Sequence, residues 1–455
     1  MTEPIVIVGA GAAGLMAAAE LVAAGRRVVL LERGDRPGRK ILVSGGGRCN
    51  LTHQGSPEAL LSVFDRPAAR FLKHAVYDLS SETLRAWLAE RGLATVAESD
   101  GCVFPASHRS KDVLDTLLRA TKGAELRTGV ACRKVLVEGG RAIGVETSAG
   151  RMAASAVILA AGGPAWPAAG GSASGLELLA AVGHAIVTPR PGLVPLVITE
   201  PWVRGLQGVS LVDAELTLDR RSAGGKGGRS GRVVTRGPLV FTHDGLSGPA
   251  ALDLSLHLDA GATVAPSSNR ADRETAHGCT RRSRGTHGKS SESTDDPGAV
   301  TVRLSLLPGR TAAEVEARLV AAATGDGSHL VRTVIPGDLP RRVIEHLLMV
   351  AGTAPNTQVG QLTRYARERL AELLTGAPLV ATLAGGWDQA MVTVGGCELS
   401  EVNSRTMESR KVAGLYVVGE LLDIAGPTGG YNLHAAFATG RLAARGIANE
   451  SCKEH

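Results

Sequence analysis

The sequence of 455 residues has few aromatic side chains, which make up only 3% of it. Its buried cores must therefore rely on Ala, Val and Leu, within an apolar fraction of 44% that suits a globular protein. Unbroken apolar runs of about 18 residues, the length of a membrane-spanning helix, are also absent. The N-terminus lacks the basic start and cleavage site of a signal peptide. We therefore expect a cytoplasmic protein with no membrane partner.

Closely spaced cysteines are missing as well. The six cysteines are scattered, and no C-x-x-C occurs among them. Zinc sites, dithiol relays and disulfide frameworks depend on such spacing, so we predict none of these and no metal. The net charge is only +6 and acids are interspersed with the basic residues. We expect a small-molecule substrate and no nucleic-acid partner, while the oligomeric state stays open.

A glycine-rich turn near the N-terminus gives the first positive signal. The β-branched run 5–8 leads into the pattern G-x-G-x-x-G, and an Ala/Leu-rich helix follows. Gly9 allows the tight turn, Gly11 lets the backbone approach a pyrophosphate, and Gly14 lets helix and strand pack closely. A second apolar strand ends at Glu32, whose carboxylate would accept hydrogen bonds from adenosine ribose hydroxyls. This spacing predicts a dinucleotide-binding βαβ unit.

The C-terminal part of the sequence distinguishes FAD from NAD. A late strand at 414–419 is followed by Asp423, and Gly430 opens the last helix. FAD is long, so its flavin half needs a second anchor that an NAD-only domain does not. We predict that Asp423 binds the ribityl hydroxyls and that the helix start at Gly430 faces the flavin carbonyl that gains charge on reduction. The loop 38–52, with three consecutive glycines, would wrap backbone amides around the cofactor between these anchors.

Changes in composition along the chain predict several domains. The predicted parts are an FAD-binding domain at 1–190 and 399–455, a β-rich substrate domain at 191–264 and 375–398, and a helical insert at 299–374. Helices are also expected at 80–91, where apolar residues recur at helical spacing, and at 110–120. Residues 265–298 contain no aliphatic side chain larger than Ala. This segment cannot bury enough apolar surface to order itself, and we predict a disordered loop.

Several motifs together resemble one known family. They are GAGAAGL, GRKILVSGGGRCNLT, VILAAGG, FTHDGLSGPA, EVNSRTMESRKVAGLYVVGE and LDIAGPTGGYN. They cover nearly the whole chain in order, and they resemble the bacterial aminoacetone-oxidase-like NAD(P)/FAD-dependent flavoproteins, a family that includes bile-acid-pathway reductases. The resemblance implies an α/β fold, with a Rossmann-like FAD domain built from both termini, a β-barrel-like second domain and a small helical insert. It also implies FAD contacts at Lys40, Asn50 and Val130.

The predicted site combines these signals. Cofactor contacts are expected at Gly9, Gly11, Ala12, Ala13, Gly14, Glu32, Lys40, Gly45, Gly47, Asn50, Val130, Gly162, Asp423, Gly430 and Asn432. The two catalytic candidates are His243, as a proton donor within FTHDGLSGPA, and Tyr431, which would line the substrate side. A histidine that only orders its own loop explains His243 equally well. His434 stands where we more often expect Gln, and its role is open.

Two classes of function remain. The favoured one is an FAD-dependent oxidoreductase acting on a small organic molecule, either an oxidase of an amine or a reductase supplied by NAD(P)H. No second glycine motif follows a strand, so NAD(P)H would bind only transiently as an electron donor. The alternative is a flavin-dependent RNA-modifying enzyme, which needs a dense basic face. In the sequence, the candidate for such a face is the stretch 270–289, in which acids are intermixed.

Overall fold

The computed structural model describes residues 3–220, 231–258 and 299–450. Contacts within the chain divide it into two compact units, Met1–Leu193 with Trp387–His455, and Val194–Gly386. The segment 265–298, for which we predicted disorder, lies outside the described residues. The functional assignment of an FAD-binding domain and a substrate domain stays a prediction.

The first unit is built around a five-stranded sheet in the order β19-β10-β1-β2-β6. Its strands are β1 (Ile5–Val8), β2 (Val28–Leu31), β6 (Glu125–Arg127), β10 (Ala156–Leu159) and β19 (Leu415–Val417). All neighbouring pairs are parallel. β1, β2 and β10 are buried along their whole length, which explains their continuous apolar runs. The carboxyl ends of these strands therefore meet along one edge of the sheet.

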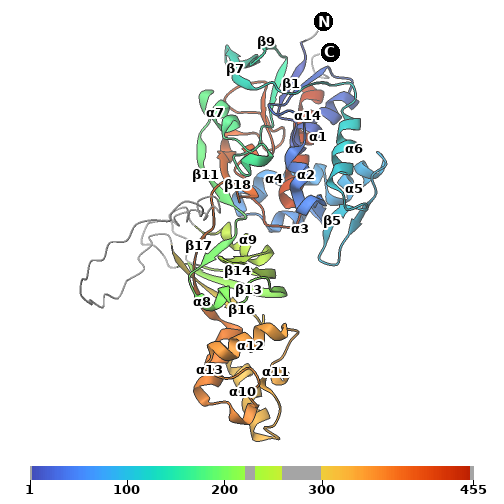
Figure 1. The fold of residues 1–455 in the computed structure, drawn as a ribbon. Coiled ribbons are helices and arrows are strands. Elements are labelled where there is room, and N and C mark those ends of the chain that lie inside the picture. Colours follow the sequence, from blue (N-terminus) through green and yellow to red (C-terminus); the bar gives the residue numbers. More distant parts are fainter. Residues whose placement is uncertain (1–2, 221–230, 259–298, 451–455) are drawn as a thin grey trace, which may run out of the picture. The chain divides into compact units, whose positions relative to one another are not determined.

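Helices from both ends of the chain complete this unit. They are α1 (Ala12–Ala23), α2 (Arg39–Val43), α3 (Pro57–Ser62), α4 (Arg66–Asp78), α5 (Ser81–Ala89), α6 (Ser110–Ala120), α7 (Ser174–Ala181) and α14 (Tyr431–Glu450). α1 and α14 pack side by side (Figure 1). Their contact is close, because a Cβ at Gly440 of α14 would lie 2.3 Å from the carbonyl oxygen of Ala13. The C-terminal helix is thus packed directly on the N-terminal βαβ unit.

Three smaller sheets flank the central sheet of the first unit. One consists of β3 (Thr52–His53), β5 (Cys102–Pro105) and β4 (Thr95–Ala97), and another of β7 (Cys132–Glu138), β8 (Arg141–Thr147) and β9 (Gly150–Ala153). The third pairs β11 (Ile186–Gly192) with β18 (Val392–Cys397) in antiparallel fashion. β18 belongs to the first unit by its contacts, whereas the sequence placed 375–398 in the β-rich part.

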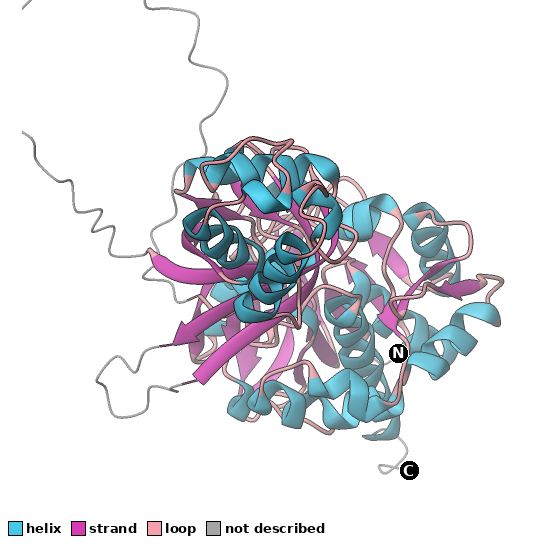
Figure 2. Cartoon of the chain, turned by 90° about the horizontal axis from the view of Figure 1, so that it is seen from below, coloured by secondary structure: helices cyan, strands magenta, loops and turns pink. Residues whose placement is uncertain are grey.

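The second unit contains a closed barrel of six strands. Around the barrel these are β12 (Leu196–Ile198), β15 (Gly245–Ser247), β14 (Gly231–Phe241), β13 (Ser210–Arg220), β16 (Val300–Ser305) and β17 (Ala377–Leu383). The helices are α8 (Pro201–Arg204), α9 (Pro249–Ser255), α10 (Ala312–Thr324), α11 (Val331–Val334), α12 (Arg341–Val350) and α13 (Arg364–Thr375). Figure 2 shows the strands in magenta and the helices in cyan.

This architecture confirms the predicted fold class. A Rossmann-type sheet joins both ends of the chain, the barrel strands lie in sequence between its strands β10 and β19, and four helices lie between barrel strands β16 and β17. None of the helices in the described ranges is long and apolar enough to cross a membrane.

Candidate functional site

The glycine turn at the start of α1 combines close packing with an open face. A Cβ at Gly14 would lie 1.9 Å from the carbonyl oxygen of Gly9, so only glycine fits there. A Cβ at Gly11 would meet nothing within 4 Å. No side chain caps α1, and the first helical hydrogen bond runs from Leu15 N to Gly11 O. The N–H groups of Ala12 to Gly14 therefore lack partners in the helix, an arrangement that fits a pyrophosphate.

Glu32 is held in a fixed position beside this turn. Its Oε2 accepts a hydrogen bond from Ala10 N at 3.1 Å, and its Oε1 accepts one from Gly34 N at 2.7 Å. Each carboxylate oxygen keeps a second acceptor site, which a ribose hydroxyl can use. Val130 N donates to the backbone oxygen of Glu32 at 2.9 Å. The structure thus brings Glu32, Val130 and the glycine turn together, as the adenosine end of the predicted site requires.

The glycine loop after α2 adopts a backbone that other residues rarely reach. Gly45, Gly46 and Gly47 have φ values of 55°, 66° and 86°. Left-handed conformations in succession favour glycine, because a Cβ would crowd the following carbonyl. A Cβ at Gly45 would also lie 2.9 Å from the backbone nitrogen of Asn50. The three glycines therefore fold the loop back on Asn50.

Asn50 in turn meets the C-terminal loop. A Cβ at Gly430 would lie 2.6 Å from a terminal atom of the Asn50 side-chain amide and 2.8 Å from Thr52 N. Gly430 itself has a φ of 92°. Two predicted cofactor positions from opposite ends of the sequence are therefore in direct contact at the start of α14.

Asn432 orders the loop that leads to Gly430. Its Nδ2 donates to Gly426 O at 2.7 Å, and its Oδ1 accepts from Gly426 N at 2.8 Å. Both polar atoms of the side chain are therefore used within the protein. A direct contact of Asn432 with the cofactor stays a prediction.

The side chain of Tyr431 lies between two other rings. It stacks on His53 with the ring centroids 5.1 Å apart, and Phe64 packs edge-on against it at 6.4 Å. Both ring nitrogens of His53 lie 2.9 Å from backbone oxygens, those of Gln54 and Asp100. These contacts hold the tyrosine ring in one place beside the start of α14. The sequence did not reveal His53 and Phe64 as its partners.

Asp423 is half-buried beside β18. Its Oδ1 accepts a hydrogen bond from Gly395 N at 3.0 Å. Burial raises the pKa of this carboxyl above its usual value. The neighbouring carboxylate of Asp65 acts in the same direction. A ligand hydroxyl that donates to Asp423 would offset part of the cost of burying its charge.

Lys40 forms an ion pair that the sequence analysis missed. Its Nζ lies 2.8 Å from Glu420 Oε2 and donates to Gly163 O at 3.4 Å. Glu420 Oε1 accepts from Thr393 N at 2.8 Å. A Cβ at Gly162 would lie 3.8 Å from Glu420 Oε2, so this predicted position adjoins the pair. The position of Glu420 directly after the last strand was the available signal, because strand ends carry ligand-binding residues in such sheets.

His243 is the one predicted residue that lies in the second unit. It occupies the turn between β14 and β15, and its Nε2 is 2.8 Å from Asp244 Oδ2. Both side chains are more than half exposed, at 67% and 53%. This geometry fits a residue that orders its own turn as well as it fits a proton donor.

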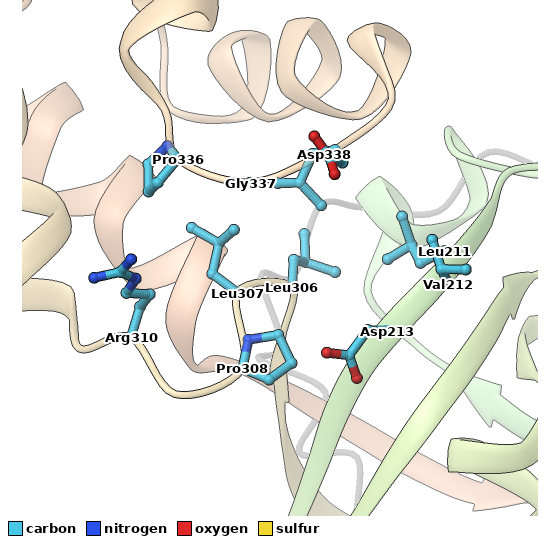
Figure 3. Close-up of a pocket in the computed structure, with 11 residues that line it drawn as sticks. Leu211, Val212, Asp213, Leu306, Leu307, Pro308, Arg310, Pro336, Gly337 and Asp338 are labelled. Carbon is cyan, nitrogen blue, oxygen red and sulfur yellow. The ribbon is translucent and has the colours of Figure 1, made fainter. Parts of the chain in front are cut away.

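A hollow in the second unit lies where the helices meet the barrel. It has a volume of about 300 Å³, and Leu306, Leu307 and Pro308 lie below the segment Pro336–Asp338 (Figure 3). Asp213 at its side is already bound by Arg236, at 2.9 and 2.7 Å. None of the predicted site residues lines this hollow. Among the described residues, no cluster of His, Cys, Asp and Glu could hold a metal ion.

Residues 3–446 match the family described as HI0933-like protein Rossmann domain. The chain belongs to this family. Relatives of this HI0933-like chain include a ribosomal RNA dihydrouridine synthase of Escherichia coli strain K12, 28% identical over 95% of both chains. A ribosomal RNA dihydrouridine synthase of Haemophilus influenzae is 26% identical over 98% of both. A 3-dehydro-bile acid delta(4,6)-reductase of Clostridium scindens is 30% identical over 97% of this chain and 98% of its own length.

The family membership agrees with the enzyme class that the motifs predict. All three relatives carry the names of enzymes, and each aligns with this chain along nearly its whole length. The bile-acid part of the sequence resemblance has a counterpart among them. The aminoacetone-oxidase-like part stays a prediction.

Proposed function

We propose that this chain is an FAD-dependent reductase of carbon–carbon double bonds that are conjugated to a carbonyl group. The convergence of two anchors on one unit carries the proposal. The uncapped start of α1 lies beside Glu32, and the loops at Asn50 and Gly430 meet near Tyr431. A long ligand with a diphosphate in its middle and a ring system at each end suits this arrangement. The residues present therefore fit FAD.

The names of the relatives suggest the type of reaction. Dihydrouridine is uridine with two hydrogens added across the ring double bond next to a carbonyl. A delta(4,6)-reductase of a 3-dehydro bile acid likewise saturates double bonds conjugated to a ketone. In both cases a hydride and a proton add to a polarised double bond, and in this chain FAD in its reduced form would supply the hydride. NAD(P)H is the proposed donor that restores the reduced cofactor.

Side chains of the first unit would position the reactants and supply the proton. Tyr431 is the proposed proton donor, because His53 and Phe64 fix its ring beside the start of α14. The positive end of the α14 dipole at Gly430 would stabilise negative charge that gathers on the reduced ring system. Asp423 would hold the ribityl chain. His243 stays a second candidate proton donor.

The substrate class has two candidates. A small enone agrees with the bile-acid reductase, and a uracil ring within RNA agrees with the two synthases. The absence of a nucleic-acid partner, which the sequence favoured, is therefore kept only as a prediction. An amine, as for an aminoacetone-oxidase-like enzyme, would instead donate a hydride to the cofactor.

An anaerobic titration of the purified protein tests the proposal. We expect a yellow protein that releases FAD, and not FMN, on denaturation. NADH or NADPH should bleach the flavin absorbance, and an added enone should restore it. A colourless protein that cannot be reconstituted with FAD would contradict the cofactor assignment. Bleaching by an amine, with no response to either nicotinamide, would favour an oxidase over the reductase.

A further inference from the structure

Helix α4 carries a row of basic side chains on its exposed face. Arg66, Arg70, Lys73 and Tyr77 follow one another at intervals of four, three and four residues, and all four are exposed. Residues with this spacing lie on one side of a helix. The opposite side is buried and consists of Ala68, Phe71, Leu72, Ala75 and Val76. At a rise of about 1.5 Å per residue, the row from Arg66 to Lys73 is about 10 Å long. We call Arg66, Arg70 and Lys73 the α4 basic row.

The α4 basic row is not neutralised by acids of its own helix. The acids at the two ends are engaged elsewhere: Asp65 caps the backbone nitrogen of Ala68 at 2.8 Å, and Asp78 pairs with Arg441 and Arg445. Within the described part of the chain, no member of the row forms an ion pair. The hydrogen bond from Tyr77 lowers the pKa of Glu58, and the charge of Lys73 acts in the same direction. Lys73 Nζ also lies 5.8 Å from the centroid of the Tyr77 ring.

Several exposed cations on other helices are paired with an acid one turn away. On α6, Arg109 pairs with Asp112 and Lys111 pairs with Asp115. On α12 and α13 the pairs are Arg341 with Glu345, Arg364 with Glu368, and Arg369 with Glu372. These i,i+3 and i,i+4 pairs are the common way to solvate a charged helix face. The α4 basic row has no such pair among the described residues, so the charges of Arg66 and Arg70, and part of that of Lys73, are available to an external anion.

The row begins next to the candidate site. Phe64, two residues before Arg66, packs edge-on against Tyr431 at 6.4 Å. Asp65 lies close enough to Asp423 for the two carboxylates to interact. A chain-like anion bound along α4 would therefore have one end beside the residues that we assign to the flavin side. This juxtaposition distinguishes α4 from a basic face elsewhere on the surface.

We propose that the α4 basic row binds the phosphate backbone of RNA and leads the strand to the candidate site. The inference rests on the proposed function, because a docked strand would present a uracil ring to the same site. Three exposed cations in line on one helix face, starting beside the candidate site, suit an extended polyanion better than a free small molecule. RNA recognition requires a dense basic face, and in the linear sequence these residues are separated by apolar ones.

Charge removal on α4 tests the proposal. The variant Arg66→Gln/Arg70→Gln/Lys73→Gln is compared with Lys111→Gln/Arg341→Gln/Arg364→Gln, which loses the same charge from paired positions. Affinity for a fluorescein-labelled RNA hairpin with a uridine loop is measured at several salt concentrations. We expect the α4 variant to bind about tenfold or more weakly, and its log–log salt dependence to be shallower by roughly 2 to 3 for three lost phosphate contacts. The control should keep wild-type affinity and slope.

The outcomes separate this inference from the proposed function. Flavin content and reoxidation by a small enone are measured on the wild type, the α4 variant and the control. Both quantities should be equal in the three proteins, since the proposal gives the row no contact with the flavin or the enone. Equal RNA affinity and slope in the wild type and the α4 variant would overturn the inference while enone reduction still supported the function. Loss of binding to phosphatidylglycerol vesicles, with RNA binding retained, would assign the row to a lipid surface and overturn it too. A wild type that binds RNA through the row but reduces neither the enone nor the uridines of the bound RNA would refute the function alone.

Discussion

Single carboxylates mark the two ends of the proposed FAD site. Glu32 is fixed by two backbone N–H groups beside the α1 turn, and Asp423 by one beside β18. The two side chains share no hydrogen-bond partner. Each can accept from a ligand hydroxyl, and hydrogen bonds to charged groups contribute about 1.5–3 kcal/mol. The consequence for FAD affinity can be measured separately at each end.

We expect Glu32→Ala and Asp423→Ala each to weaken FAD binding by roughly ten- to a hundredfold. The penalties should be close to additive in the double variant, because the sites are independent. Only Asp423→Ala should shift the flavin absorption spectrum, since only that end adjoins the ring system. Fluorescence quenching on titration of the apoprotein with FAD gives the affinities. The matched control is Asp115→Ala, an exposed carboxylate on α6. Wild-type affinity and an unaltered spectrum for Asp423→Ala would show that the C-terminal anchor is misplaced.

His434 should make the fold sensitive to acid. It is 2% exposed, neither ring nitrogen has a hydrogen bond of good geometry among the described residues, and burial lowers its pKa to about 4 from 6.5. Between these two pH values the unfolded chain takes up a proton that the folded chain does not. The free energy of unfolding therefore falls by about 3 kcal/mol as the pH drops through this window, and it recovers as the pH rises.

His434→Gln removes this titration, so the free energy of unfolding should fall less steeply as the pH drops below neutral. We expect its stability relative to the wild type to increase steadily from neutral pH to about pH 4. Urea unfolding at a series of pH values measures the difference, and His329→Gln, at an exposed position, serves as the control. Parallel stability curves for the wild type and His434→Gln would show that His434 is protonated or hydrogen-bonded in the folded protein.

A site residue could be predicted from the sequence only where a short local motif is enough to define its role. Glu32 and the glycines are defined by spacing within one βαβ unit, and so they could be predicted. The pairing of Glu420 with Lys40 could not, because the two residues are 380 positions apart in the sequence. The same holds for Tyr431 and His53, whose stacking depends on how two loops fold. Which side chains meet across loops is set by the tertiary structure.

Among the structural elements, the α1 turn offers a test in which two neighbouring glycines should behave in opposite ways. Gly14→Ala places a Cβ 1.9 Å from Gly9 O, whereas Gly11→Ala places one in open space. We expect Gly14→Ala to lower the melting temperature of the apoprotein markedly or to prevent folding, because the helix must move off the strand. Gly11→Ala should keep the apoprotein melting temperature and weaken FAD binding by about tenfold or more, since the new methyl group occupies the pyrophosphate space. A Gly11→Ala protein with wild-type FAD affinity would argue against this cradle.

Helices with a clear apolar spacing could be located from the sequence, and others were missed. The helices expected at 80–91 and 110–120 are observed at Ser81–Ala89 and Ser110–Ala120. Helix α4 was not predicted, although Asp65 caps it and a proline occupies its first turn. β18 lies within 375–398, which the sequence analysis assigned to the β-rich part. Its pairing with β11 is a long-range contact, which the local sequence does not determine.

At the scale of the whole molecule, the first unit is discontinuous in sequence. β19 and α14 return to the sheet that β1 opens, and Val157 pairs with Leu415 beside its pairing with Val6. Without β19 and α14, one edge of β10 would be unpaired and one face of α1 would be uncovered. The proposed cofactor site needs the same C-terminal segment, because this segment contains Asp423 and Gly430. Removal of the C-terminal part should therefore destroy both the fold and the site.

The segment 265–298 should be dispensable for the folded molecule and its cofactor. It lies in the sequence between α9 and β16 of the second unit, while every predicted cofactor residue belongs to the first. Its lack of aliphatic side chains larger than Ala means that its removal costs little apolar burial. We expect replacement of 265–298 by a short Gly/Ser linker to leave the flavin content and the melting temperature nearly unchanged. Calorimetry and the visible spectrum of the two proteins measure both quantities. Scrambling the segment at constant length is the control for linker strain. A large fall in melting temperature for the linker and the scrambled variant alike would show that the native segment packs against the protein.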